Sequence, residues 1–364
     1  MTVFDPNNKH SLKTKMFLDK GVSIARYDEL KYKQFDILTD KQLGFFWRPQ
    51  EVDLTKDTKD FRSLSGHEQH IFTSNLKRQI ILDSVQGRAP SLALLPICSL
   101  PELEVWIQTW SFNETIHSQS YTHIIRNIFS DPSKVFDEIL NIPEIVECAK
   151  DISKYYDGLI VWNKNDWYLD PPSESQLHRH KKALWLALNS INALEGIRFY
   201  VSFACSWAFA ELKKMEGNAK IIKFIARDEN LHLSGTQKML ALLPEDDADF
   251  KKIRKECELE VQKIFEDVVN QEKAWADYLF KDGTMIGLNS DILKQYIEWI
   301  ANRRMKAIDI DSPYKTGSNP LPWTQKWIAG GDIQVAPQET QLNSYVVGAV
   351  NMDVQEDSFK DFKL

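Results

Sequence analysis

Two helix-like segments of this chain carry the same pair of metal-binding residues at the same spacing. The first pair is Glu114 and His117, and the second is Glu229 and His232. Each residue of an α-helix turns by about 100°, so residues three positions apart lie on one face. A four-helix bundle that holds two metal ions in its interior uses such a pair on each of two helices. The repeated pair therefore predicts a bundle with a two-metal site.

A single Glu-x-x-His pair has a simpler explanation, because a surface glutamate beside a core histidine has the same spacing. The two-metal arrangement also requires one carboxylate from each of two further helices. Asp83 and Glu195 meet this requirement, since each interrupts an apolar run. A carboxylate is costly to bury unless it meets a cation or is protonated. The four segments together predict a site of four carboxylates and two imidazoles.

The remaining sequence predicts an all-α protein, because strand signals are nearly absent. Helical periodicity and breakers predict helices over residues 27–49, 66–87, 101–129, 142–167, 174–212, 217–243, 248–280 and 290–307. The 364 residues, 43% of them hydrophobic, are enough to bury a large core. We expect an irregular surface arm over residues 1–25, one helical body over residues 26–330 and a tail over residues 331–364.

Composition argues against several classes of partner. The net charge of −7 disfavours bulk binding to nucleic acid or to an anionic membrane. The longest apolar segment, residues 199–210, is too short to cross a bilayer, and the N-terminus lacks the apolar core of a signal peptide. The four cysteines form no C-x-x-C pair and are typical of free thiols in a reducing compartment. We expect a soluble cytoplasmic protein that binds neither nucleic acid nor a membrane.

The predicted ligands also indicate the chemistry of the site. Carboxylates and imidazoles supply hard oxygen and borderline nitrogen donors, which suit Fe(II) or Mn(II). A pair of such ions reduces O₂ and generates a strong oxidant. Tyr121 lies one helical turn after His117, close enough to lose an electron and a proton to the metals. Its alternative role is that of an ordinary core tyrosine with a satisfied hydroxyl.

Several neighbours of the ligands are expected to shape the site. Phe199 and Phe203 follow Glu195 by one and two helical turns. Ile225 precedes the second Glu-x-x-His pair by one turn, so all three side chains are expected to wall the site with apolar groups. Ordinary core packing explains the same spacing. Asp228 has the right chemistry to orient the histidine of the first pair, and its alternative is a surface aspartate.

Beyond Pro320 the helical pattern ends. The last residues, 353–364, are acidic and carry isolated apolar side chains among the charges. A disordered tail without a role has this composition. A short peptide whose apolar residues dock into a groove on a partner has it too.

Seven stretches of the chain match motifs of one known family. They are Ala25-Arg26-Tyr27, Phe45-Phe46-Trp47-Arg48-Pro49, residues 82–88, residues 118–127, Ala226-Arg227-Asp228-Glu229, Val335-Ala336-Pro337-Gln338-Glu339 and Tyr345. The chain resembles the small (β, or R2) subunit of aerobic class I ribonucleotide reductase over nearly its whole length. It is most similar to the bacterial and phage branch, which uses a di-iron centre and a tyrosyl radical. The resemblance implies a ferritin-like helical bundle.

The resemblance also implies roles for individual residues. Two iron ions, or manganese in their place, would be bound by Asp83, Glu114, His117, Glu195, Glu229 and His232. Tyr121 would hold the stable radical. Trp47 and Asp228 would connect the site to the surface. Glu339 and Tyr345 would carry the radical step across to the large subunit.

The partners implied by the resemblance are a second copy of the chain, an electron donor for cofactor assembly and the large (alpha) subunit. The C-terminal tail would dock on that large subunit, which would also carry the nucleotide sites that this sequence lacks. Two other classes compete with this interpretation. One is a different di-metal oxidase or oxygenase, and the other is a ferritin-like iron-binding protein or a structural helical subunit. The tail with Tyr345 and the chain of Trp47, Asp228 and His117 favour the reductase.

Overall fold

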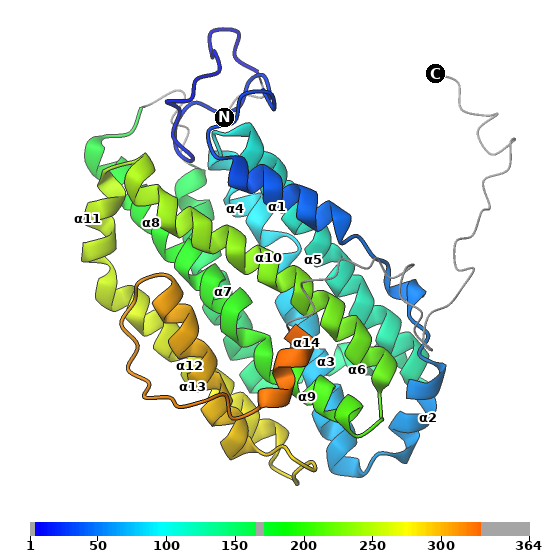
Figure 1. Cartoon of the computed structure of the whole chain (residues 1–364). Coiled ribbons are helices and arrows are strands. Elements are labelled where there is room, and N and C mark those ends of the chain that lie inside the picture. The colour runs from blue at the N-terminus through cyan, green and yellow to red at the C-terminus, as the bar shows by residue number, and fades with distance from the viewer. Residues whose placement is uncertain (1–3, 165–170, 329–364) are drawn as a thin grey trace, which may run out of the picture.

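The computed structural model describes residues 4–164 and 171–328 (Figure 1). This part of the chain contains no β-strand and only two isolated bridges, which confirms the predicted all-α class. The helices are α1 (Lys33–Gly44), α2 (Thr55–Ser63), α3 (Gly66–Gln86), α4 (Ala89–Ala93), α5 (Pro101–Ile128), α6 (Pro132–Asp137), α7 (Pro143–Asn163), α8 (Glu174–Ala193), α9 (Tyr200–Glu211), α10 (Glu216–Asp246), α11 (Asp249–Glu256), α12 (Glu258–Leu279), α13 (Ser290–Ala307) and α14 (Gln325–Ile328). The short 3₁₀ turns are η1 (Pro49–Glu51), η2 (Leu95–Ile97), η3 (Ile139–Asn141) and η5 (Pro322–Thr324).

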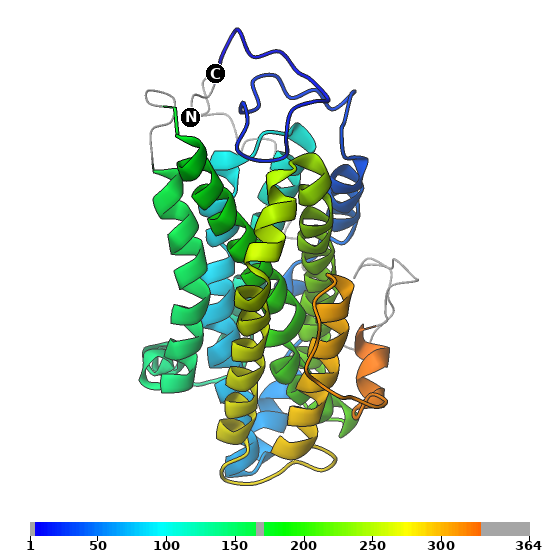
Figure 2. The same ribbon diagram turned by 90° about the vertical axis from the view of Figure 1, so that its left-hand side faces the viewer.

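The long helices run side by side along one direction, and the N-terminal segment loops over one end of the bundle (Figures 1 and 2). Helix α3 packs against α5, α5 against α10, α10 against α9, and α9 against α3. These contacts close a ring of four helices around a common interior. Large aromatic side chains, including Trp106, Trp110 and Trp207, are fully buried in the core.

Local signals explain where several helices begin. Ser65 and Glu68 form a capping box at the start of α3, in which the Ser65 backbone N–H donates to Glu68 Oε2 at 2.8 Å. Pro101 occupies the first turn of α5, where its missing N–H costs nothing. The carboxylate of Asp57 accepts the backbone N–H groups of Gly217 and Asn218 at the start of α10. A carboxylate at this position also complements the positive end of the helix dipole.

One predicted helix contains an irregular turn. The helix expected over residues 174–212 is present as α8 and α9, but the π-helical segment η4 (Leu194–Arg198) joins them. A π-helical turn holds one extra residue, and such turns are frequent at functional sites. Glu195 lies within η4.

Several helix boundaries differ from the prediction. The helix expected over residues 248–280 is interrupted at Cys257, where α11 ends and α12 begins. The first helix begins at Lys33 instead of residue 27, and it ends before Trp47. Helix α10 continues through Pro244 to Asp246, three residues beyond the predicted end. Boundaries of this kind depend on tertiary contacts that override local propensity.

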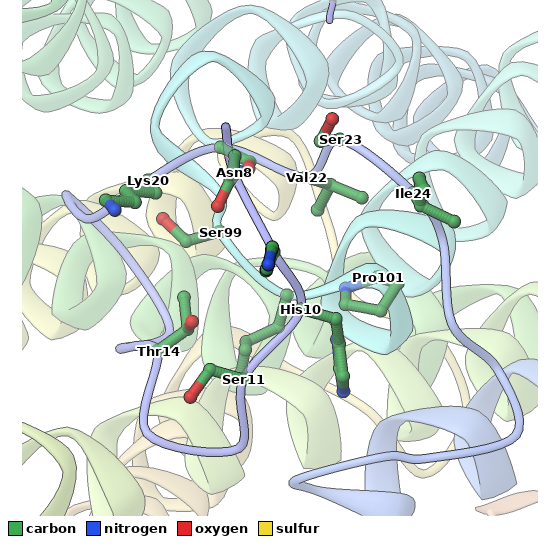
Figure 3. A pocket seen from close by; sticks show the side chains of 13 residues that line it. Asn8, His10, Ser11, Thr14, Lys20, Val22, Ser23, Ile24, Ser99 and Pro101 are labelled. Carbon is green, nitrogen blue, oxygen red and sulfur yellow. Dashed lines mark hydrogen bonds between the residues drawn. The ribbon is translucent and has the colours of Figure 1, made fainter. Parts of the chain in front are cut away.

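The N-terminal arm was expected to lie on the surface, but part of it is buried. Met16 and Phe17 are 0% and 2% exposed. The Leu18 N–H donates to the Ile97 carbonyl at 2.9 Å, and the Met16 N–H donates to Asp246 Oδ2 at 2.7 Å. Figure 3 shows the loop closing over Ser99 and Pro101, where it leaves a cavity of about 20 Å³. This volume is about that of one water molecule.

Two predictions from composition concern the described residues directly. All four cysteines lie among them, and each is buried and free, as expected. Within residues 4–164 and 171–328, no helix combines the length and the apolarity that a membrane crossing requires.

Candidate metal centre

The interior of the bundle holds two overlapping groups of buried ligand atoms. Within each group, the candidate ligand atoms lie within 4.8 Å of one another. The groups are Asp83, Glu114, His117 and Glu229, and Glu114, Glu195, Glu229 and His232. Glu114 and Glu229 belong to both groups, so their carboxylates lie between two metal positions. The structure thus brings together all six residues that the sequence pointed to.

Four elements supply these ligands. Helices α5 and α10 each present one Glu-x-x-His pair, because residues three positions apart share a face. Asp83 comes from the last turn of α3, and Glu195 comes from the π-helical segment η4. Helices α3, α5, α10 and α9 close a ring, and η4 leads directly into α9 and packs against α10, so all four ligand-bearing elements face the same interior.

Both imidazoles direct the same ring nitrogen at the carboxylates. His117 Nδ1 lies 3.2 Å from Glu114 Oε2 and 3.1 Å from Glu229 Oε1. His232 Nδ1 lies 3.0 Å from Glu114 Oε1 and 3.2 Å from Glu229 Oε2. The two Nδ1 atoms are therefore positioned as metal ligands, one in each group.

The crowded carboxylates have strongly shifted pKa values. Burial and the charge of Glu114 raise the pKa of Asp83 well above its usual range, and they raise the pKa of Glu229 to about 8. Burial and the charge of Glu229 raise the pKa of Glu195 as well. Burial alone would raise the pKa of Glu114, but the imidazoles of His232 and His117 outweigh burial and lower that pKa. Without a cation, burial and mutual repulsion therefore favour the protonated forms of Asp83, Glu195 and Glu229, and a cation would favour their ionised forms.

These residues fit two divalent cations. Neither oxygen of Asp83 accepts a hydrogen bond of normal geometry, and the same holds for Oε2 of Glu195. A buried carboxylate oxygen without a partner is costly, and a cation removes that cost. Two divalent ions would also balance the charge of four carboxylates. The donor set, oxygen with some imidazole nitrogen, is typical of iron and manganese sites.

Asp228 and Trp47 extend the site through His117. The indole N–H of Trp47 donates to Asp228 Oδ2 at 2.8 Å, and the same oxygen lies 3.3 Å from His117 Nε2. All three side chains are fully buried, so the alternative of a surface aspartate does not apply. Burial opposes ionisation of Asp228, but the hydrogen bond from His117 and the charge of Arg227 outweigh it and lower the pKa of Asp228. An ionised Asp228 orients the imidazole so that Nδ1 faces the carboxylates of Glu114 and Glu229.

Tyr121 is fully buried beside Asp83. Its hydroxyl makes no hydrogen bond of normal geometry with the described residues. Burial and the charge of Asp83 raise the pKa of Tyr121 well above its usual range. The phenol therefore keeps its proton at neutral pH and lies next to the carboxyl group of Asp83.

The three apolar side chains expected to wall the site are fully buried. The rings of Phe199 and Phe203 stack with centroids 5.6 Å apart and an interplanar angle of 9°. Ile225 lies one turn before Glu229 on α10. Their role as a protective wall stays a prediction.

Two residues predicted to carry the radical step to the large subunit, Glu339 and Tyr345, lie outside the described residues.

The sequence interpretation missed two residues that contact the site. Gln86 Nε2 donates to Glu195 Oε1, and the hydroxyl of Tyr156 donates to Gln86 Oε1. Gln86 follows Asp83 by three residues, so helical spacing could have placed it on the same face. Tyr156 lies on α7 and had no such signal. A third contact, from Trp110 Nε1 to Glu114 Oε1 at 2.8 Å, joins residues four apart on α5.

Comparisons with known proteins agree with this site. A family model described as "Ribonucleotide reductase, small chain" matches residues 25–320. A protein of Haemophilus influenzae, named ribonucleoside-diphosphate reductase subunit beta, is 54% identical over 373 residues, covering 100% of this chain and 99% of that protein. The chain belongs to the ribonucleotide reductase small-chain family. This result confirms the resemblance inferred from the sequence motifs.

Other small chains of ribonucleotide reductase are also similar over their full length. Subunit beta of reductase 1 from Escherichia coli O157:H7 is 52% identical, covering 100% of this chain and 99% of that protein. Subunit beta from Enterobacteria phage T4 is 44% identical with the same coverage.

Solved structures of this family share the fold. The R2 subunit from Clostridium botulinum has a TM-score of 0.76 at 24% identity, covering 90% of this chain and 98% of that one. A dimanganese(II) protein from Streptococcus sanguinis has a TM-score of 0.66 at 19% identity, covering 84% of this chain and 99% of that one. The predicted ferritin-like bundle is therefore confirmed.

Proposed function

We propose that this chain is the radical-generating subunit of a ribonucleoside-diphosphate reductase. The observation that carries the proposal is the buried double cluster of ligands with the hydroxyl of Tyr121 beside it. Relatives that carry this name match the chain from end to end. The chain would be active only together with the large subunit, which reduces the ribonucleotide to a deoxyribonucleotide.

The metal ligands follow from the two overlapping groups. Asp83 and His117 would hold one iron ion, Glu195 and His232 would hold the other, and Glu114 and Glu229 would contact both. Bound iron, together with O₂, supplies an oxidant strong enough to remove an electron from a phenol. The same donor set also suits manganese.

The protein residues control where the electron and the proton come from. Tyr121 is the oxidisable ring beside the site, and its hydroxyl proton moves to the neighbouring carboxylate of Asp83. The stacked pair of Phe199 and Phe203, with Ile225, excludes water and offers no group that reduces a phenoxyl radical. These properties would give the Tyr121 radical a long lifetime.

A hydrogen-bonded chain would connect the radical to the surface. Trp47, in the α1–η1 loop, is hydrogen-bonded to Asp228, and Asp228 contacts the candidate ligand His117. When the indole of Trp47 loses an electron, Asp228 accepts the proton from Nε1. Glu339 and Tyr345 would continue the transfer to the large subunit, as the family resemblance implies.

Metal loading tests the proposed function. Metal-free protein receives Fe(II) and then air, and electron paramagnetic resonance and optical absorption are recorded. We expect iron uptake followed by a tyrosyl radical signal. Uptake of iron without a radical would contradict the proposal and would favour a different di-metal oxidase or an iron-storage protein, provided that loading with Mn(II) also produces no radical. The electron donor for cofactor assembly stays a prediction of the resemblance.

The C-terminal tail is proposed to dock on the large subunit. Removing residues 346–364 should weaken the association of the two subunits by at least about tenfold, or roughly 1.4 kcal/mol. The deletion should leave the tyrosyl radical unchanged, because none of the ligands lies in the tail. Binding to the large subunit can be measured by surface plasmon resonance. An unchanged dissociation constant would refute the docking role.

A homodimer is proposed from an apolar patch on α1, α4 and α5. These helices and the loop after α1 carry five exposed apolar side chains, and two of them, Phe46 and Phe112, are in contact; the five are Ile37, Leu43, Phe46, Leu92 and Phe112. The rings of Phe46 and Phe112 stack with an interplanar angle of 4°, and α5 packs against both α1 and α4. Clustered apolar side chains on a surface indicate a protein interface. We propose that a second copy of the chain covers this patch.

Sedimentation analysis tests the dimer. Phe112→Glu places a charge in the patch and should raise the dimer dissociation constant by at least about tenfold. Leu140→Glu is the matched control, since Leu140 is 69% exposed in η3, outside the patch. A monomeric wild-type protein, or a Phe112→Glu protein that dimerises as tightly as wild type, would refute this interface.

A further inference from the structure

A chain of two hydrogen bonds reaches Glu195 from outside the ligand cluster. The hydroxyl of Tyr156, on α7, donates to Gln86 Oε1 at 2.6 Å. Gln86, on α3, donates from Nε2 to Glu195 Oε1 at 2.5 Å. Gln86 is fully buried and Tyr156 is 3% exposed, so water cannot replace either bond. The three residues lie on three different elements of the bundle.

The chemistry of the groups fixes the direction of both hydrogen bonds. A carboxylate that binds a metal is ionised and only accepts hydrogen bonds, so the amide nitrogen of Gln86 must face Glu195 in the metal-bound protein. The amide oxygen then faces Tyr156, and an amide oxygen also only accepts. The tyrosine hydroxyl must therefore donate. By donating to the amide oxygen, Tyr156 restrains the Gln86 side chain in the orientation that presents its N–H group to Glu195.

The hydrogen bond makes the two oxygens of Glu195 unequal. Oε1 accepts from Gln86, whereas Oε2 has no hydrogen-bond partner. Asp83 differs, because neither of its oxygens accepts a hydrogen bond of normal geometry. Gln86 therefore restrains one oxygen of Glu195, whereas no such bond restrains Asp83.

The backbone of Glu195 is restrained from the opposite side. Arg304 of α13 donates from Nε to the carbonyl of Gly196, within the π-helical segment η4, at 3.3 Å. A Cβ at Gly196 would lie 3.2 Å from Arg304 Cγ and 3.2 Å from Leu233 Cδ1, so the turn is closely packed. With the main chain held in this way, the remaining freedom of Glu195 lies in its side-chain torsions. The hydrogen bond from Gln86 restricts those torsions.

We propose that Gln86, held by Tyr156, is a positioning residue that orients the carboxylate of Glu195 toward the metal position shared with His232. The inference rests on the two-metal function proposed above and deepens it. Hydrogen bonds to a ligating group control its orientation and its donor strength, and losing one typically lowers metal affinity by about 10- to 100-fold. The effect should concern one of the two metal positions, because Gln86 contacts no other candidate ligand through a hydrogen bond within the described residues.

Cobalt binding to the metal-free protein tests this role without relying on activity. Co(II) is titrated by calorimetry, and its d–d absorption reports the coordination of each ion. Gln86→Met keeps the length of the side chain but removes the donor. It should lower the affinity for one of the two cobalt ions by about 10- to 100-fold. Tyr156→Phe frees the amide to rotate and should weaken the same ion by a smaller factor. Both variants should change the cobalt spectrum of that ion.

Tyr296→Phe is the matched control, since Tyr296 is a fully buried tyrosine of α13 outside this hydrogen-bond chain. It should bind both ions as the wild type does. Wild-type affinities and spectra in both Gln86→Met and Tyr156→Phe would overturn the proposal. So would an equal weakening of both ions with a lower melting temperature of the metal-free protein, which indicates a packing role. If Gln86→Met does not fold, the cobalt affinity and spectrum of Tyr156→Phe test the proposal alone. A wild-type protein that binds no cobalt would instead refute the two-metal function itself.

Discussion

Tyr121→Phe is expected to abolish nucleotide reduction and to leave the metal site intact. The substitution removes one hydroxyl, which makes no hydrogen bond of normal geometry, and it keeps the buried ring. Metal binding and the melting temperature should therefore stay close to those of wild type. Turnover with the large subunit should fall by about 1000-fold or more, as it does when a chemically essential group is removed. Radical yield is measured by electron paramagnetic resonance, and turnover is measured by deoxyribonucleotide formation.

Two observations would separate this role from a structural one. Tyr296→Phe removes another buried tyrosine hydroxyl and should keep both the radical and the turnover. Nucleotide reduction that persists in Tyr121→Phe would contradict the assignment of the radical to this residue. Loss of iron together with the radical would show that the hydroxyl supports the metal site instead.

Asp228→Asn is expected to stop turnover while the radical still forms. Asparagine keeps the shape of the side chain, and its oxygen can still accept the indole N–H of Trp47. The amide is far less basic than the ionised carboxylate, so it cannot take the proton when Trp47 is oxidised. Nucleotide reduction should fall by at least about 100-fold, the scale of a lost acid–base group. Iron content and radical yield, measured on the same preparation, should stay near wild type.

Asp228→Ala provides the comparison for this variant. Alanine removes the hydrogen bond from Trp47 and the contact with His117 Nε2, so metal binding should also weaken, by about 10- to 100-fold. A variant with asparagine that reduces nucleotides at the wild-type rate would show that Asp228 only orients His117. Weakened metal binding in both variants, with equal loss of turnover, would also exclude a separate role in proton transfer.

Local sequence patterns were sufficient to identify the candidate ligands. Glu114 with His117, and Glu229 with His232, are three residues apart, and this separation places each pair on one face of any α-helix. Asp83 stood out because it interrupts an apolar run, and a buried carboxylate needs a partner. These patterns are local properties of the chain, so they can be recognised without knowing how the helices pack.

The family resemblance identified residues that helical spacing could not identify. It indicated Trp47 and Asp228, which are 181 residues apart in sequence and hydrogen-bonded in the structure. The residues alone left a surface aspartate as an equal alternative for Asp228. Its complete burial excludes that alternative. Spacing could not reach this result, because contact between distant segments depends on how the helices pack.

The sequence by itself determined the helical class, the faces of α5 and α10 that carry ligands, and the chemistry of the donor set. These features follow from the 3.6-residue period and from the cost of burying charge. Only the tertiary structure decided the π-helical turn at Glu195, the burial of Met16 and Phe17, and the hydrogen bonds from Tyr156 through Gln86 to Glu195. Each of these depends on contacts between segments far apart in the chain, and no local pattern encodes the packing that creates them.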